Sequence, residues 1–198
     1  TLGQGSSNAT CGPYASGGAF MTEVDVSQNF ACAAQVGIGG DGNERPVQAL
    51  QAAISESMNA PGACNAGFIR DDAILVVVII TDEEDDHEID GCDQLPQPGS
   101  AGEPDGWFQG IIARKAGIES NVVMLSLIGP TDTAQLCPLL DKCAGGIDGA
   151  EPGHRLVQLT NSFTHGFIGR VCEPTYDQFF GQAVGVIESA CDGFIPPG

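Results

Sequence analysis

The strongest hydrophobic pattern in the sequence is an unbroken apolar run, ILVVVII, at residues 74–80. Aspartates flank this run on both sides. A short run rich in β-branched residues and bounded by polar ones is typical of a strand that is buried on both faces of a parallel sheet. The run NVVMLSLI at residues 121–128 has the same character, and it predicts a second buried strand.

Helical periodicity appears between and after these two runs. Apolar residues recur at helical spacing over residues 45–58, and Pro46 occupies the first turn, where a helix tolerates proline. The sequence predicts further helices at residues 107–115 and 176–191, and a third, shorter strand at residues 155–160.

The remaining segments carry weaker patterns. Residues 1–42 are rich in glycine, serine and asparagine, which predicts mainly loop with a short edge strand at residues 20–26. Residues 133–144 predict either a short helix or a turn closed by a cystine. Strands that alternate with helices imply right-handed crossovers. We therefore expect residues 1–198 to form a single α/β domain with a doubly wound, mostly parallel sheet and helices on both faces.

The negative charge of the chain disfavours two classes of partner, nucleic acid and anionic membranes. There are 26 acidic residues against 7 basic ones, which gives a net charge of −19. Nucleic acid and anionic membranes bind cationic surfaces, so both are poor partners for this chain. No membrane span is expected either, because no run reaches the roughly 18 apolar residues that a spanning helix needs.

The cysteines indicate the compartment. Their number is eight, an even count, and no CxxC pair occurs, which disfavours zinc ribbons and thioredoxin-like redox sites. We therefore expect a disulfide-bonded protein from an oxidising compartment, either secreted or at the cell surface, extracellular or periplasmic. Cys11 with Cys32, and Cys137 with Cys143, are candidate pairs because each would close a short loop.

The acidic segment TDEEDD, residues 81–86, directly follows the first predicted strand. In open α/β sheets, ligands bind beyond the carboxyl ends of the strands. Carboxylates packed together without lysine or arginine repel one another, and a hard cation such as Mg²⁺ or Ca²⁺ would relieve that repulsion. Asp82, with Asp85, is therefore a candidate metal ligand. A solvated acidic loop is the alternative interpretation.

Glu44 is a further candidate. It lies in the glycine-rich segment GIGGDGNERP, residues 37–46, just before the first predicted helix. Its carboxylate could cap that helix and interact favourably with the helix dipole. Alternatively, it could reach the same cation as Asp82.

Catalysis has no positive signal in the sequence. No nucleophile elbow, phosphate-binding loop or dinucleotide fingerprint follows a predicted strand. The three histidines, His87, His154 and His165, are scattered singly and lack the spacing of a helical zinc site. We therefore do not expect an enzyme.

Four segments together carry a family resemblance: GNERPVQALQAAIS, NAGFIRDDAILVVVIITDEEDD, NVVMLSLIGP and RVCEPTYDQFF. In this order they resemble the von Willebrand factor A-like domains of secreted or lipid-anchored bacterial surface proteins. The resemblance implies a metal-ion-dependent adhesion site, in which a Mg²⁺-like ion completes its coordination with a carboxylate of the partner. Asp82 matches the aspartate after the fourth strand of that family, and Glu44 lies where a threonine is usual.

The chain departs from the family in one respect: the D-x-S-x-S ligand motif of the family does not occur in this sequence. The resemblance thus implies that residues 1–198 are the later part of such a domain, without its N-terminal strand, helix and second strand. We expect an upstream segment, a cleaved companion or a neighbouring subunit to supply the missing central strand. The expected function is extracellular adhesion or binding of a protein ligand. The alternative is a structural subunit of an extracellular assembly with an incomplete or absent metal site.

Overall fold

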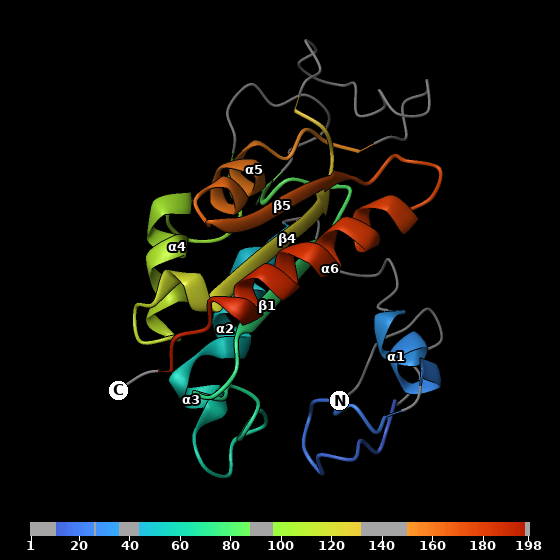
Figure 1. Ribbon diagram of the computed structural model, residues 1–198. Helices are drawn as coiled ribbons and strands as arrows, with labels where there is room; N and C mark the ends of the chain where they lie inside the picture. The colour runs from blue at the N-terminus through green and yellow to red at the C-terminus, as the bar shows by residue number, and fades with distance from the viewer. Residues whose placement is uncertain (1–10, 26, 36–43, 88–96, 132–149, 197–198) are drawn as a thin grey trace. The chain divides into compact units, whose positions relative to one another are not determined.

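The computed structural model describes residues 11–25, 27–35, 44–87, 97–131 and 150–196 (Figure 1). The chain divides into two compact units. The first consists of Thr1–Asp41 and Ala53–Ile69, and the second of Gly42–Ala52 and Arg70–Gly198. The predicted turn or helix at residues 133–144, and with it the Cys137–Cys143 pair, lies outside the described residues.

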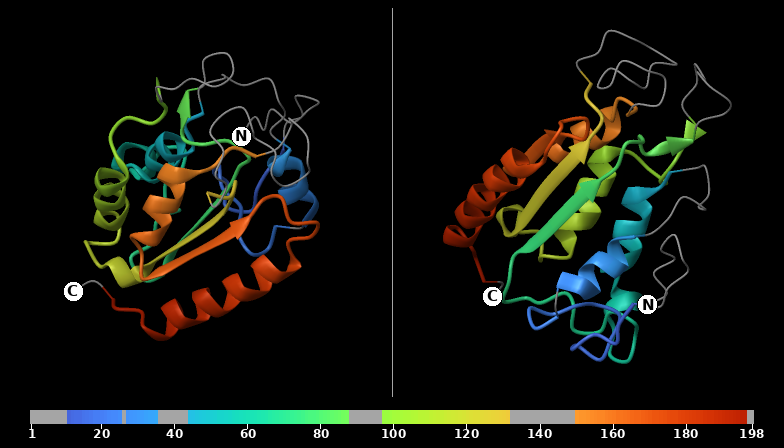
Figure 2. Two further views of the ribbon diagram at one scale, coloured as in Figure 1. Left: turned by 90° about the horizontal axis from the view of Figure 1, so that it is seen from above. Right: turned by 90° about the vertical axis from the view of Figure 1, so that its right-hand side faces the viewer.

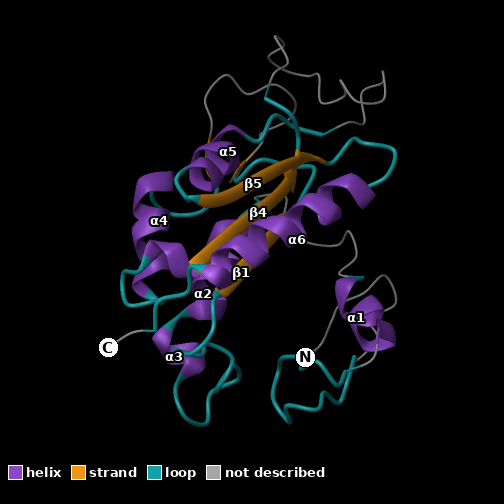
Figure 3. Cartoon of the chain, in the orientation of Figure 1, coloured by secondary structure: helices purple, strands orange, loops and turns teal. Residues whose placement is uncertain are grey.

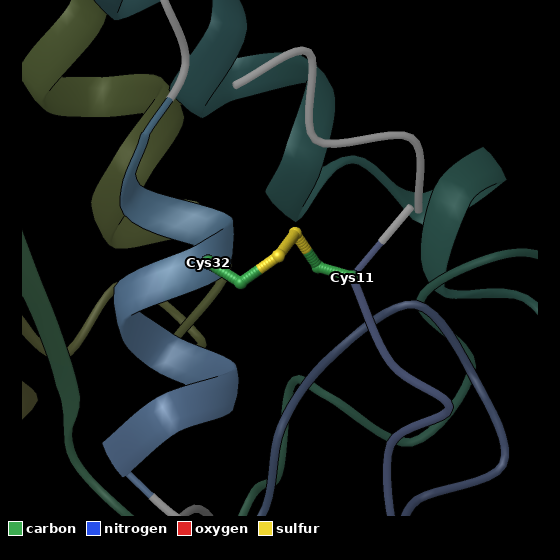
Figure 4. Close-up of a disulfide and its surroundings, with 2 residues drawn as sticks. All are labelled: Cys11 and Cys32. Carbon is green, nitrogen blue, oxygen red and sulfur yellow. A yellow bond between two sulfur atoms is a disulfide. The ribbon is translucent and has the colours of Figure 1, made fainter. Parts of the chain in front are cut away.

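The first unit is held together by a disulfide and by short turns. Cys11 and Cys32 are bonded, which confirms the predicted pair and ties helix α1 (Ser27–Ala34) to the segment before it (Figure 4). The short strand predicted at residues 20–26 is wrong for the described residues 20–25, which form turns and bends. The reason is Asp25, whose carboxylate accepts a hydrogen bond from the Thr22 N–H at 2.6 Å and closes a turn. This bond lowers the pKa of Asp25.

The helix predicted at residues 45–58 is two helices, α2 (Pro46–Ile54) and α3 (Glu56–Asn59). Pro46 begins α2, as its fixed backbone angle predicts. Ser55 interrupts the helix because its backbone is extended, with φ −61° and ψ 155°. Its hydroxyl accepts from the Met58 N–H at 3.3 Å, so Ser55 caps α3.

The second unit contains a three-stranded parallel sheet with the order β1, β4, β5 (Figure 3). Strands β1 (Leu75–Ile80) and β4 (Val122–Ile128) confirm the two strands predicted from the apolar runs. The chain is thus an α/β protein, and β4 is buried along its whole length at the centre of the sheet. A short antiparallel pair, β2 (Asp86–His87) and β3 (Gln97–Pro98), lies apart from this sheet.

The third strand was predicted at the wrong place. Residues 155–160 belong to helix α5 (His154–Asn161), and the strand β5 is His165–Arg170 instead. Leu156, Leu159 and Thr160 are buried at helical spacing, and the Thr160 hydroxyl donates to the Leu156 carbonyl one turn earlier at 2.7 Å. Six residues are too few to distinguish the period of a helix from that of a strand. The packing of the buried Leu156, Leu159 and Thr160 favours the helix.

Helices lie on both sides of the parallel sheet (Figure 2). Helix α6 (Asp177–Asp192), predicted within one residue, packs Phe179 and Ala183 against alternate residues of β4. Helices α4 (Pro104–Ala113) and α5 lie on the opposite side, where the hydroxyls of Ser126 and Thr160 are 2.7 Å apart. A 3-10 turn (Glu119–Asn121) leads into β4. Pro104 starts α4 three residues before the predicted boundary.

Strand β1 differs from the prediction in its burial. Leu75, Val77 and Ile79 are buried, but the alternate side chains are 37%, 46% and 57% exposed at Val76, Val78 and Ile80. The prediction of a strand buried on both faces is therefore wrong for β1, although it holds for β4. Helix α6 packs over β4 and β5 and leaves this face exposed over β1, which is an edge strand of the sheet formed by the described residues.

Candidate functional site

The acidic segment leaves β1 through a tight turn. The Thr81 N–H continues the sheet by donating to the Leu127 carbonyl at 3.1 Å. Its hydroxyl then accepts from the Glu83 N–H at 3.0 Å, which turns the chain. Asp82, at the outside of this turn, has an exposed side chain, while its carbonyl accepts from the Glu151 N–H at 2.7 Å. The two carboxylates that follow, Glu84 and Asp85, are buried.

Asp85 is fully buried, and its carboxylate caps a helix that lies far away in sequence. Its Oδ2 accepts from the Val47 N–H of α2 at 3.0 Å and from the Ser100 hydroxyl at 2.7 Å. Its Oδ1 accepts from the Ser100 N–H at 2.6 Å. The Ser100 hydroxyl also accepts from the Gln48 N–H at 2.7 Å. Since Pro46 has no N–H, Asp85 and Ser100 satisfy the first free donors of the helix.

Arg155 supplies the positive charge nearest to this buried carboxylate. Its Nη1 lies 3.8 Å from Oδ1 of Asp85 and donates to the Asp85 backbone carbonyl. Its Nη2 donates to the Gly102 carbonyl at 2.7 Å. The guanidinium also lies over the Trp107 ring, 4.4 Å from the ring centroid. Arg155 therefore joins α5 to the segment after β1 and to the loop that precedes α4.

Glu84 and Glu151 complete the same hydrogen-bonded cluster. One oxygen of Glu84 accepts from the Asp85 N–H at 2.8 Å, and the other accepts from the Arg155 N–H at 2.6 Å, at the beginning of α5. Glu151 accepts from the Glu84 N–H at 2.8 Å. A carboxylate at a helix N-terminus interacts favourably with the helix dipole. We call Glu84, Asp85, Ser100, Glu151 and Arg155 the Asp85 network.

The backbone approaches the Asp85 network closely at Gly99. A β-carbon placed there would lie 2.5 Å from the Glu44 carbonyl oxygen and 2.6 Å from Oδ1 of Asp85. Any side chain at Gly99 would therefore force apart the loop before α2 and the segment after β1. Gly99 thus lies against both the Glu44 backbone and Asp85.

The three predicted metal ligands occupy different environments. Asp85 holds the N-terminus of α2, Asp82 is exposed, and Glu44 is half-buried. The N–H groups of Val47 and Gln48 are bound by Asp85 and Ser100, not by Glu44 as the capping interpretation predicted. Within the described ranges, no group of three or more His, Cys, Asp or Glu side chains is placed to hold a metal ion. Ligation by Asp82, Glu44 or Asp85 stays a prediction.

Sequence reasoning missed Ser100, Glu151 and Arg155. Arg155 had a usable signal. The chain has 26 acidic residues and 7 basic ones, so few side chains could pair with a buried carboxylate, and Arg155 is one of them. Ser100 had a weaker signal, its place directly after a proline and a glycine in a turn-forming segment. Glu151 had none, because it follows a segment whose fold the sequence does not predict.

Comparisons of the chain with protein-family models, with curated proteins and with solved structures found no match. Among the helices of the described residues, none has both the length and the apolar character required to cross a membrane.

Proposed function

We propose that this chain is an extracellular protein-binding module resembling von Willebrand factor A-like domains, and that it contacts its partner at β1. The observation that carries the proposal is the exposed row of Val76, Val78 and Ile80 on an edge strand of a parallel sheet. Parallel sheets normally have both faces covered, and an apolar strand with an open edge readily pairs with another chain. A partner that covers this row removes apolar surface from water.

The backbone of β1 supports the same proposal. Because Thr81 donates to β4, the alternation of a strand directs the N–H groups of Val77 and Ile79 to β4 as well. The N–H groups of Val76, Val78 and Ile80 then point to the opposite edge. No strand formed by the described residues pairs with that edge. A segment of an upstream region, a companion chain or a neighbouring subunit could pair there.

A divalent cation is the finer part of the proposal. The resemblance implies Mg²⁺ or Ca²⁺ at the carboxyl edge of the sheet, with Asp82 as its first ligand and Glu44 and Asp85 as further candidates. The exposed carboxylate of Asp82 is open to such an ion. A doubly wound fold of the von Willebrand factor A type belongs to the same proposal.

A structural subunit of an extracellular assembly is the second candidate. It is favoured by the buried carboxylates, because Glu84 and Asp85 accept hydrogen bonds that hold α2, α5 and the loop before α4. On this alternative the acidic segment stabilises the fold and needs no metal. Cation binding separates the two candidates.

Site-specific photo-crosslinking tests the contact at β1. A benzophenone amino acid at position 78 should give an adduct heavier than the 20.4 kDa chain in the cells or medium that produce the protein. The matched control carries the same group at Gln158, which is exposed on α5 at the other side of the sheet. Adducts in equal yield from both positions, or none from position 78, would contradict the proposal.

A further inference from the structure

The apolar row of β1 continues a surface that α6 covers only in part. In the parallel register Val78 lies beside Leu125, and Leu125 beside Phe167, so all three side chains point to the same face. Helix α6 packs on that face over β4 and β5, with Phe179 stacked on Phe167 at 5.4 Å between ring centroids. Over β1 the same face is open, because Val76, Val78 and Ile80 are exposed.

One flank of α6 adds to this open face. Gln178 and Gln182 line a hollow at the outer edge of β5, while Phe179 faces the sheet. Successive helical residues are rotated by about 100°, so Phe180 and Val184 lie on the flank opposite the hollow, the one nearer β1. They are 45% and 53% exposed, although both are apolar. We call Val76, Val78, Ile80, Phe180 and Val184 the β1–α6 surface.

The position of this surface, beside α6 on one face of the sheet, suits a helix. In an α/β sheet the layer beside a strand is filled by helices, and neighbouring helices pack 8–10 Å apart, a typical range for side chains that interdigitate. A helix lying on Val76, Val78 and Ile80 would therefore also contact Phe180 and Val184. An apolar stripe along one side of such a helix would cover both parts of the surface.

The charges around the surface define the occupant further. Asp71 and Asp72 are exposed before β1, directly after the exposed Arg70. Asp82 is exposed after β1, and Glu188 is exposed on α6, so acidic residues outnumber the one basic residue in this set. A second copy of this chain also carries a net charge of −19, so its approach to these acidic residues is electrostatically unfavourable. A partner with lysine or arginine beside its apolar stripe is complementary to these acidic residues.

We infer that the β1–α6 surface binds an amphipathic helix of another polypeptide, with an apolar stripe flanked by lysine or arginine. The inference rests on the proposed function and names the chemistry of the partner. The stripe covers the β1–α6 surface, and the cationic residues meet Asp71 and Asp72. Pairing at the edge of β1 and packing on its face involve different groups, so the two can be tested apart.

Designed peptides test this inference by fluorescence anisotropy. The first is an 18-residue helix with leucines at i, i+3, i+4 and i+7 spacing and flanking lysines. The second has glutamates in place of the lysines, and the third has the composition of the first in an order that abolishes the stripe. We expect saturable binding of the first peptide alone. Val78→Asp or Val184→Asp should lower the affinity for the first peptide by about tenfold or more, because the substitution would bury a charge in an apolar contact.

Val24→Asp is the matched control, since Val24 is 69% exposed in the first unit and should leave affinity unchanged. Equal binding of the first and third peptides would show that net charge alone drives the interaction, and it would overturn the inference. So would an equal loss with Val24→Asp, absence of binding, or a concentration-dependent dimer that Val78→Asp dissociates. A crosslink at position 78 without binding of the first peptide would overturn the helix but leave the proposed function standing.

Discussion

Replacing Asp85 by alanine is expected to lower the free energy of unfolding of the second unit by about 3–5 kcal/mol, the cost of breaking a buried ion pair by removing one partner. The substitution leaves the N–H groups of Val47 and Ser100 without their acceptor. It also removes the carboxylate that faces the Arg155 guanidinium, 3.8 Å away. Urea denaturation followed by circular dichroism measures the change.

Asp82→Ala is the matched control for this experiment. Asp82 is three residues away in the same acidic segment, but its side chain is exposed and its backbone carbonyl makes the local hydrogen bond. The substitution should therefore change the free energy of unfolding by no more than about 0.5 kcal/mol. Similar losses for the two variants would contradict the structural role assigned to the Asp85 network.

Asp82→Ala should, in contrast, abolish cation binding. Titration of the wild-type chain with Mg²⁺ and with Ca²⁺ in a calorimeter is expected to give saturable heat, because an exposed carboxylate at the carboxyl end of β1 offers hard oxygen donors. The variant should give heat of dilution only. Since Asp82 contributes little to stability, the loss cannot be attributed to unfolding.

The same titration decides between the two proposed functions. Saturable heat that Asp82→Ala removes supports adhesion through an ion. Absence of heat from the wild-type chain would contradict the cation and favour the structural subunit. Heat that survives Asp82→Ala would show that the ion binds elsewhere and that Asp82 is not its ligand.

The sequence predicted the two strands that lie in long apolar runs and missed the strand that does not. Residues 74–80 are apolar throughout, residues 121–128 are apolar except for Asn121 and Ser126, and each range contains a strand that pairs in parallel with the other. Strand β5 reads HGFIGR, where two glycines and two basic residues conceal the pattern. Gly169 is required there because a β-carbon would overlap the Phe179 ring of α6.

The sequence predicted that Asp85 belongs to the candidate site, but it did not predict what Asp85 does there. An acidic segment after a buried strand was visible, and Asp85 was among the candidates. Its role depends on partners that are 38, 15 and 70 residues away, namely Val47, Ser100 and Arg155. Hydrophobic patterns do not encode such pairings, since no periodicity connects a buried carboxylate to a distant helix N-terminus.

Amide hydrogen exchange along β1 tests the central claim, that this strand has an open edge at which a partner binds. Alternate residues should differ: the amides of Val76, Val78 and Ile80 should exchange much faster than those of Val77 and Ile79, which are bonded to β4. In the isolated chain this gives a two-residue period of protection. Equal protection of all five amides would show that the edge is already occupied, and it would contradict the account.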